Sequence, residues 1–313
     1  MTVMQYDLII AGGGPAGAAG GVYAARKKMK TLLVAESFGG QSIVSNEIQN
    51  WIGTKAVSGL ELAGMLEGHL RAQEGLEIEE GERIAGIRDM GDGLEISAES
   101  GKKWLTKYLL LATGSRRRKL GIPGEKEMDG KGVAYCSICD APIFKDKDVA
   151  IVGGGNAGLE AVLDSLPYAR KIYLLERGEE LKGDAVTQEK IGKDPKVQVI
   201  TRAETLEIIG EQFVSGLRYK DGSGEIKELA VQGVFVEIGA VPNSDPAKGV
   251  VEMNRMGEVV VDHKTQRTSH PRIWAAGDVS DVLYKQNNIS AGDAVKAALA
   301  AYAYLQKRAQ RAG

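Results

Sequence analysis

Two segments of the chain repeat one short supersecondary pattern, and this repetition constrains the fold more than any other feature. In the first, an apolar run at 6–10 leads into the glycine-rich turn 12–17, a helix of small residues, a second apolar run and Glu36. In the second, an apolar run at 148–152 leads into the turn 153–158, a helix, an apolar run and Glu176. Strand, G-x-G-x-x-G turn, helix, strand and acid in this order are typical of a dinucleotide-binding βαβ unit. The sequence therefore predicts an α/β fold with two such units.

The same pattern predicts which residues touch the two nucleotides. Pro15 suits the first helical position, where its missing N–H costs nothing. Glu36 lies 24 residues after Gly12, and Glu176 lies 23 residues after Gly153, the spacing at which a carboxylate bonds a ribose hydroxyl. The predicted contacts are Gly12, Gly14, Pro15, Ala16, Gly17 and Glu36 in the first unit, and Gly153, Gly155, Asn156, Ala157, Gly158 and Glu176 in the second.

Both cysteines of the chain lie in Cys136-Ser137-Ile138-Cys139-Asp140, spaced C-x-x-C. Two cysteines cannot build the disulfide framework of a secreted protein, so a redox-active pair in a reducing cytosol is the better interpretation. Zinc is disfavoured, because two cysteines and scattered histidines do not supply four ligands, and we expect no metal site. Incidental or structural thiols are the alternative. A dithiol flanked by two nucleotide-binding turns indicates electron transfer.

Composition excludes several classes of partner. Forty Lys and Arg against 42 Asp and Glu give a net charge of -2, which suggests neither a nucleic-acid nor a membrane-surface partner. The first apolar run is too short for a signal sequence or a transmembrane helix. At 313 residues, about two domains are expected. We therefore expect a soluble, cytoplasmic protein.

The remaining segments complete the expected elements. Residues 59–73 have helical periodicity, 76–112 indicate a β-meander, and a strand at 272–276 ends in Gly277-Asp278. Ser290 and Asp293 have the S-x-x-D spacing of a helix start, with the helix continuing to about Gln306. His263 and His270 lack a partner cluster and are interpreted as surface residues. Further strands of the second domain are expected at 197–200, 203–209, 213–219 and 229–238.

Glu176 also bears on the nicotinamide donor. A carboxylate at this position accepts hydrogen bonds from ribose hydroxyls but repels a 2′-phosphate. Arg177 is followed by Gly178-Glu179-Glu180, which add negative charge, whereas NADPH would need arginines here. The sequence favours NADH over NADPH.

With these residues in place, the chain resembles the low-molecular-weight thioredoxin reductases along nearly its whole length. Within that group it is similar to the NADH-dependent flavoprotein component of alkyl hydroperoxide reductase, without the N-terminal thioredoxin-like region of that component. Cys-Ser-Ile-Cys-Asp stands where the family commonly has Cys-Ala-Thr-Cys-Asp. The resemblance is carried by Gly12 to Gly17, Gly39-Gly40-Gln41, Asn50-Trp51, Ala112-Thr113-Gly114, Ile122-Pro123-Gly124, Cys136 to Asp140, Gly153 to Gly158, Gly277-Asp278, Gln286 and Ala291-Gly292.

The resemblance implies two Rossmann-like domains of three-layer ββα architecture, with the nicotinamide domain inserted into the FAD domain, and a homodimer. The FAD domain would comprise residues 1–118 and 245–313, and the NAD(P)H-binding and dithiol domain residues 119–244. Further FAD contacts are implied at Gly39, Gly40, Gln41, Asn50, Ala112, Thr113, Gly114, Gly277, Asp278 and Gln286.

The resemblance also implies the order of electron transfer. Electrons would pass from NADH through FAD to a Cys136–Cys139 disulfide, and on to a thioredoxin- or glutaredoxin-like protein. Cys139 would face the flavin and form the charge-transfer thiolate, Cys136 would attack the substrate disulfide, and Asp140 would deliver a proton. A C-x-x-C pair at a helix start lowers the thiol pKa, which favours this exchange. The inserted domain is expected to rotate about its two connections, near 116–119 and 243–246.

Two other functions remain open from the sequence. One is a ferredoxin-dependent flavin thioredoxin reductase that uses no nicotinamide. The intact second glycine turn and Glu176 are hard to explain there. The other is a non-catalytic, flavin-bound redox sensor.

Overall fold

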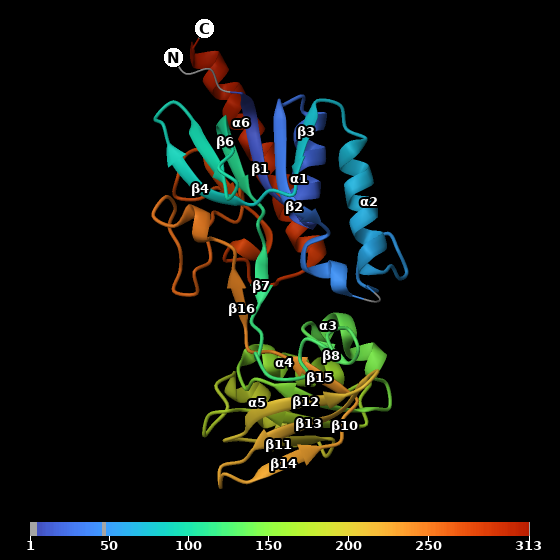
Figure 1. The fold of residues 1–313 in the computed structure, drawn as a ribbon. Helices are drawn as coiled ribbons and strands as arrows, with labels where there is room; N and C mark the ends of the chain where they lie inside the picture. The colour runs from blue at the N-terminus through green and yellow to red at the C-terminus, as the bar shows by residue number, and fades with distance from the viewer. Residues whose placement is uncertain (1–4, 46–47, 313) are drawn as a thin grey trace. The chain divides into compact units, whose positions relative to one another are not determined.

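The computed structural model describes residues 5–45 and 48–312, so the outer ends of the predicted FAD domain, residues 1–4 and 313, lie outside it. The chain divides into two compact units (Figure 1): unit 1 comprises residues 1–116 and 241–313, and unit 2 comprises residues 117–240. The segments that join the units include strands β7 (Ser115–Arg117) and β16 (Ala240–Pro242), which pair as a two-stranded sheet.

Unit 1 is built on a seven-stranded sheet in the order β3-β2-β1-β6-β5-β4, with β17 also paired to β6. Its core is parallel: β1 pairs with β2 and β6, and β17 pairs with the second half of β6. The first half of β6 continues into an antiparallel meander with β5 and β4. The strands are β1 (Tyr6–Gly13), β2 (Thr31–Phe38), β3 (Leu76–Glu80), β4 (Ile84–Asp89), β5 (Leu94–Ala98), β6 (Lys103–Leu111) and β17 (Ile273–Ala275).

The predicted β-meander over 76–112 is wrong for its first strand. Leu76 of β3 pairs with Thr31 of β2 in parallel register. The chain reaches β3 through helix α2 (Gly59–Arg71), and a crossover through a helix returns a strand parallel to the one it left. Only β4, β5 and β6 form the meander.

Helices α1 (Pro15–Arg26), α2 and α6 (Asn287–Ala312) pack in unit 1, with α1 and α6 in close contact (Figure 1). Leu8 and Ile10 of β1 point into one core with α1 and α6, whereas Ile9 points into a second core with the meander strands. Small residues in α1 let this helix pack closely on the sheet: a Cβ at Gly20 would lie 2.7 Å from Cδ2 of Leu110 in β6.

Helix α6 begins at Asn287, three residues before the predicted start at Ser290. The backbone N–H of Ser290 already donates to the carbonyl of Gln286. Asp293 is buried, and it accepts a hydrogen bond from Gln266 at 2.9 Å, so it does not cap the helix. The S-x-x-D spacing therefore does not mark a capping box.

His270 is also not the surface residue that the sequence indicated. Its side chain is only 11% exposed, and its Nε2 lies 3.1 Å from Oδ2 of Asp89. His263 is exposed as expected.

Unit 2 is built on a five-stranded parallel sheet in the order β11-β10-β9-β15-β8. Helices α3 (Ser137–Asp140), α4 (Asn156–Ser165) and α5 (Ala185–Gly192) belong to this unit, and residues of α4 and α5 share a core with one face of the sheet. An antiparallel sheet in the order β12-β13-β14 shares the core of the other face. The strands are β8 (Val133–Ala134), β9 (Asp148–Val152), β10 (Lys171–Leu175), β11 (Val197–Ile200), β15 (Gly233–Val236), β12 (Glu204–Gly210), β13 (Val214–Lys220) and β14 (Ile226–Leu229).

The single strand predicted over 229–238 is wrong. The structure divides this segment between β14, which ends at Leu229, and β15, which begins at Gly233. Residues 226–228 of β14 are exposed and pair with β13, whereas β15 is fully buried between β9 and β8. The chain leaves one sheet and enters the other around Gln232-Gly233, which interrupts the apolar run between Val231 and Val234.

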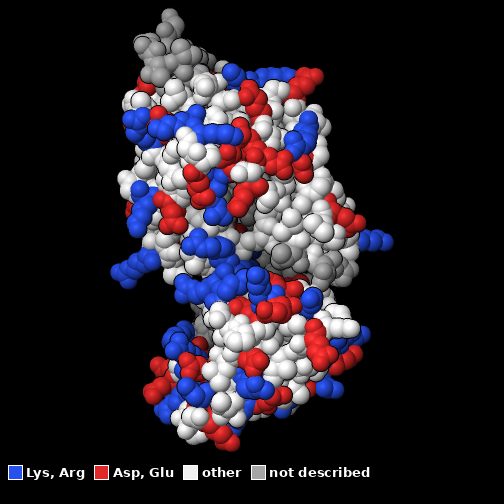
Figure 2. All heavy atoms as spheres, in the orientation of Figure 1, with Lys and Arg blue, Asp and Glu red and all other residues white. Residues whose placement is uncertain are grey.

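Short 3₁₀ helices connect several elements, at Gly40–Val44, Ala141–Phe144, Asp245–Ala247 and Gly277–Val279. Across residues 5–45 and 48–312, we find no helix that is both long and apolar enough to span a membrane. Basic and acidic side chains are interspersed over the visible face, as the nearly balanced composition leads one to expect (Figure 2).

Candidate functional site

The first glycine turn has the geometry of a nucleotide-binding turn. Gly12 has a φ of +120°, and a Cβ there would lie 2.2 Å from the carbonyl oxygen of Ala112. A Cβ at Gly17 would lie 1.8 Å from the carbonyl oxygen of Gly12, so only glycine lets α1 pack this closely on β1. The helix starts at Pro15 with Gly14 as N-cap and no side-chain cap. The first-turn amides of α1 therefore lack a side-chain acceptor at the N-cap, which suits a phosphate.

The second glycine turn repeats this geometry in unit 2. Gly153 has a φ of +124°, and a Cβ at Gly158 would lie 1.7 Å from the carbonyl oxygen of Gly153. Helix α4 starts at Asn156 with Gly155 as N-cap, again without a side-chain cap. A Cβ at Gly155 would meet no atom within 4 Å, which leaves room for a pyrophosphate next to the backbone. Both turns therefore fit a bound dinucleotide.

The two acids at the ends of the second strands differ in their surroundings. Glu36 is exposed, and its carboxylate pairs with Arg83 at 2.9 Å. Glu176 is buried, and its carboxylate accepts hydrogen bonds from the backbone N–H groups of Gly154 at 2.8 Å and Gly178 at 2.7 Å. Glu176 is thus fixed next to the second turn, where the sequence predicts a ribose.

Three cations near Glu176 have acidic partners: Arg177 and Lys182 follow it in the chain, and Arg202 donates its backbone N–H to the carbonyl of Gly178. Arg177 lies 3.6 Å from Glu204, Arg202 lies 3.0 Å from Glu179, and Lys182 lies 3.8 Å from Glu176 itself. A 2′-phosphate would have to compete with these carboxylates for each cation.

Several predicted FAD contacts gather in unit 1 around the start of α1. A Cβ at Gly14 would lie 3.7 Å from Cα of Gly40, and a Cβ at Gly277 would lie 3.3 Å from Cβ of Ala16. Gly39, Gly40, Gly114 and Gly277 all have positive φ angles.

Polar side chains extend this group. The side chain of Gln41 donates to Ser115 at 3.0 Å and to Asp278 at 3.2 Å. Asn50 donates to the side chain of Gln286 at 3.3 Å, and Thr113 donates to the carbonyl of Asn243 at 2.8 Å. The structure therefore brings together predicted FAD contacts that lie more than 200 residues apart in sequence.

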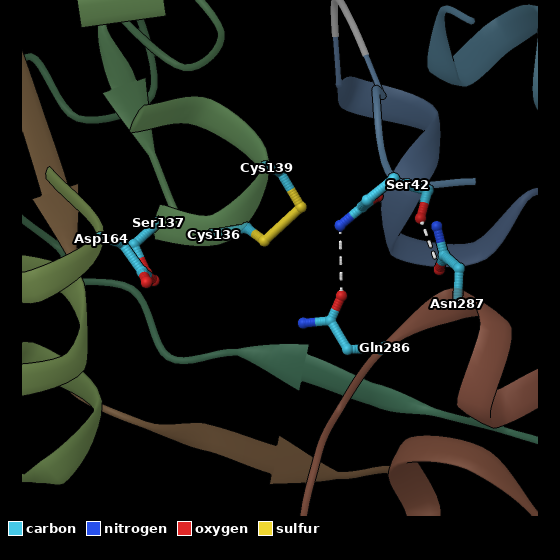
Figure 3. Close-up of a disulfide and its surroundings, with 8 residues drawn as sticks. Ser42, Cys136, Ser137, Cys139, Asp164, Gln286 and Asn287 are labelled. Carbon is cyan, nitrogen blue, oxygen red and sulfur yellow. Dashed lines mark hydrogen bonds between the residues drawn. A yellow bond between two sulfur atoms is a disulfide. The ribbon is translucent and has the colours of Figure 1, made fainter. Parts of the chain in front are cut away.

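The dithiol lies at the start of a short helix in unit 2. Cys136 is the N-cap of α3, and the N–H of Asp140 donates to its carbonyl at 3.0 Å. Cys136 and Cys139 form a disulfide with their Cα atoms 5.3 Å apart (Figure 3). A thiol at a helix N-terminus is stabilised as the thiolate, so the location favours thiol–disulfide exchange.

Two carboxylates that the sequence did not single out hold the residue next to Cys136. The hydroxyl of Ser137 donates to Asp164 of α4 at 2.8 Å (Figure 3). The backbone N–H of Ser137 donates to the carboxylate of Glu237. The one available signal for Glu237 is its place at the end of a predicted strand, where functional side chains of parallel sheets gather.

Burial raises the pKa of two acids near the dithiol. Burial raises the pKa of Asp140 to about 6, although the nearby Arg117 acts in the opposite direction. Burial also raises the pKa of Glu237 to about 7, against the effects of Arg117 and the Ser137 amide. Both groups can exchange a proton near neutral pH.

The sheet of unit 2 aligns these features along one edge. Glu176 follows β10, Gly153 follows β9, Glu237 follows β15, and Cys136 lies two residues beyond β8. Because β10, β9, β15 and β8 are neighbours in a parallel sheet, their carboxyl ends meet at the same edge. Ligands of open α/β sheets bind at this edge.

The acidic side chains near the dithiol do not form a metal centre. Within the described part of the chain, no three His, Cys, Asp or Glu side chains are grouped so as to hold a metal ion.

A family model described as pyridine nucleotide-disulphide oxidoreductase matches residues 6–302. A protein named NADH dehydrogenase from Bacillus subtilis (strain 168) is 44% identical over 301 residues, covering 96% of this chain and 58% of that protein. A component of alkyl hydroperoxide reductase from Pseudomonas putida is 44% identical over 304 residues, with the same coverage of 96% and 58%. The chain thus spans 58% of the length of these relatives.

Solved structures are similar over almost the whole chain. Thioredoxin reductase from Streptococcus pyogenes MGAS5005 has a TM-score of 0.89 at 30% identity, covering 96% of this chain and 98% of that one. Thioredoxin reductase from Giardia duodenalis has a TM-score of 0.90 at 29% identity, covering 97% and 100%. The predicted fold of two Rossmann-like domains is confirmed by these likenesses.

Proposed function

Because the chain belongs to the pyridine nucleotide-disulphide oxidoreductase family, we propose that it passes electrons from NADH through FAD to the Cys136–Cys139 disulfide, and on to a disulfide of a thioredoxin- or glutaredoxin-like protein. One observation carries the proposal. The disulfide includes Cys136, the N-cap of α3, and it lies at the same edge of the sheet as the glycine turn 153–158. Nucleotide binding and disulfide chemistry thus share one unit.

The two cofactors are assigned to different units. Unit 1 would hold FAD through the turn at 12–17 and the cluster of Gln41, Asp278, Asn50 and Gln286. Unit 2 would hold the nicotinamide nucleotide through the turn at 153–158, with Glu176 on the ribose. The N-caps Gly14 and Gly155 have no capping side chain, which supports both assignments, since the helix N-termini then face the pyrophosphates.

NADH is favoured over NADPH as the donor. Glu176 is a buried anion at the place where NADPH would add the negative charge of its 2′-phosphate, and the cations Arg177 and Arg202 are paired with Glu204 and Glu179. The relative named NADH dehydrogenase from Bacillus subtilis supports the same choice.

A bound flavin supplies two-electron transfer between a nicotinamide and a disulfide. Cys139 is assigned the side of the dithiol that exchanges electrons with the cofactor. Cys136 is assigned the attack on the protein disulfide, as a thiolate favoured by the helix N-terminus. Asp140 is assigned proton delivery to the leaving thiolate, because its raised pKa keeps a proton available near neutral pH. We also propose a homodimer that works in a reducing cytoplasm.

Anaerobic mixing of the FAD-loaded protein with NADH, NADPH or reduced ferredoxin tests the donor. We expect NADH to bleach the flavin absorbance rapidly and NADPH to do so much more slowly. Bleaching by reduced ferredoxin alone would contradict the proposal and support a ferredoxin-dependent reductase. Bleaching by NADH without turnover of any thioredoxin- or glutaredoxin-like disulfide would support a redox sensor.

A further inference from the structure

Glu237 lies between the dithiol and the second nucleotide turn along one sheet edge. Strand β15 lies between β9 and β8, and Glu237 follows β15 directly. Its backbone N–H donates to the carbonyl of Val152 at 2.8 Å, and its carboxylate accepts the N–H of Ser137. The carboxyl group is thus held at the N-terminus of α3, whose N-cap is Cys136.

The charged groups that face this carboxyl come from three elements. Arg117 of β7 favours its ionised form, whereas Asp164 of α4 and Asp140 of α3 disfavour it. Glu237 is only 8% exposed, and its burial is the largest of these effects. The result is a carboxyl group that gains and loses its charge around neutral pH, at a site where the proposed electron transfer assigns it no role.

An ionised Glu237 opposes a thiolate on Cys136 in two ways. Its negative charge lies at the start of the same helix turn, and like charges disfavour each other's ionisation. It also engages the N–H of Ser137, one of the helix-terminal amides that stabilise a thiolate at an N-cap. When Glu237 is protonated, the repulsion between its charge and the Cys136 thiolate is absent.

We propose that Glu237 is a positioning residue that fixes Ser137 at the start of the dithiol helix and, through its charge, sets the fraction of Cys136 that is thiolate in the reduced protein. This role deepens the proposed function and rests on it, because Cys136 is the thiol assigned to attack the protein disulfide.

The test uses Cys136 as the only thiol. The chain has two cysteines, so the Cys139→Ser protein retains Cys136 alone. In this background the rate of Cys136 alkylation by iodoacetamide is measured from pH 5 to 10, with and without Glu237→Gln. Gln can still accept the Ser137 N–H but carries no charge.

We expect Glu237→Gln to lower the pH midpoint of Cys136 alkylation by on the order of one pH unit. Alkylation below the midpoint then becomes about threefold faster, since a less basic thiolate is also a weaker nucleophile.

Matched variants separate charge from structure. Glu228→Gln removes the same charge from exposed strand β14 and should leave the midpoint unchanged. Glu237→Asp keeps an ionisable group and should retain a midpoint close to that of Glu237. If Glu237→Gln does not fold, Glu237→Leu supplies an uncharged side chain suited to a buried position, and the same downward shift is expected.

An unchanged midpoint in the uncharged variant, an equal shift in Glu228→Gln, or an Asp variant that behaves like Gln would overturn the proposal. The assay contains neither a nicotinamide nor a protein disulfide. A wrong donor or acceptor assignment therefore leaves its outcome untouched.

Discussion

The backbone N–H of Gly154 donates to the carboxylate of Glu176 across 2.8 Å. Gly178 donates to the other carboxylate oxygen at 2.7 Å, so backbone N–H groups fix both oxygens, while the cation Lys182 lies farther away at 3.8 Å. An acid held in this way keeps its orientation at the corner of the second nucleotide turn. A ribose hydroxyl can donate to it, whereas a phosphate at the same place would be repelled.

Glu176→Ala should therefore reduce the donor preference. Losing hydrogen bonds to a charged group costs about 1.5–3 kcal/mol, so flavin reduction at low NADH concentration should slow about 10- to 100-fold. NADPH, which gains nothing from this carboxylate, should be affected less. Stopped-flow bleaching with both donors measures the ratio. Glu189→Ala on α5 removes an exposed acid that pairs with Lys193 and serves as control. An unchanged NADH to NADPH ratio would show that Glu176 does not select the donor.

Gly158→Ala should disable the second turn. The added Cβ would lie 1.7 Å from the carbonyl oxygen of Gly153, so α4 must move away from β9. Such overpacking costs about 1–3 kcal/mol in the free energy of unfolding, and NADH binding should be lost. Denaturant unfolding and NADH titration report the two effects.

Gly192→Ala is the matched control for that variant. Gly192 also lies in a helix of unit 2, but a Cβ there meets no atom within 4 Å. Its free energy of unfolding should change by less than about 1 kcal/mol and should rise if it changes. Equal effects of the two variants would contradict the packing argument.

Cys139→Ser should separate the two halves of the proposed reaction. The FAD and nicotinamide turns contain no cysteine, so FAD binding and NADH-driven bleaching should persist, while reduction of a protein disulfide should disappear. Ser137→Ala is the control, because it loses the 2.8 Å contact with Asp164 but keeps both sulfur atoms and should retain turnover. Disulfide turnover by the Cys139→Ser protein would falsify the assignment of the dithiol.

The sequence predicted the parts of the fold that are set by local pattern. The glycine turns at 12–17 and 153–158 were predicted from spacing, since glycine is the residue that readily adopts the φ angles of Gly12 and Gly153. A helix start at the C-x-x-C pair was also expected, and α3 begins directly after Cys136.

Features that depend on contacts between distant segments were not predicted. The prediction ran through Gln232-Gly233, because apolar residues on both sides of this pair contribute to one core, and only pairing in different sheets separates β14 from β15. The S-x-x-D pattern at Ser290 failed because α6 already begins at Asn287 and the buried carboxylate of Asp293 accepts a hydrogen bond from Gln266 of another segment. Glu237 and Asp164 were missed for the same reason, since the order of β15 and β8 brings Glu237 to Ser137 and the packing of α4 on α3 brings Asp164 there.

Asp140 should make the stability of the protein depend on pH. Its pKa is raised from 3.8 to about 6, so the unfolded chain releases this proton at lower pH than the folded chain. The folded state therefore loses stability as pH rises from about 4 to 6, and the loss is complete above this range. Asp140→Asn cannot ionise, so its free energy of unfolding relative to the wild type should rise over that window by about 2–3 kcal/mol. Denaturant unfolding at pH 4.5 and pH 7.5 measures the difference. Asp146→Asn, at an exposed position, should show no comparable pH-dependent gain. A constant difference between Asp140→Asn and wild type at the two pH values would mean that Asp140 titrates at its ordinary pKa, and it would remove the basis for proton delivery near neutral pH.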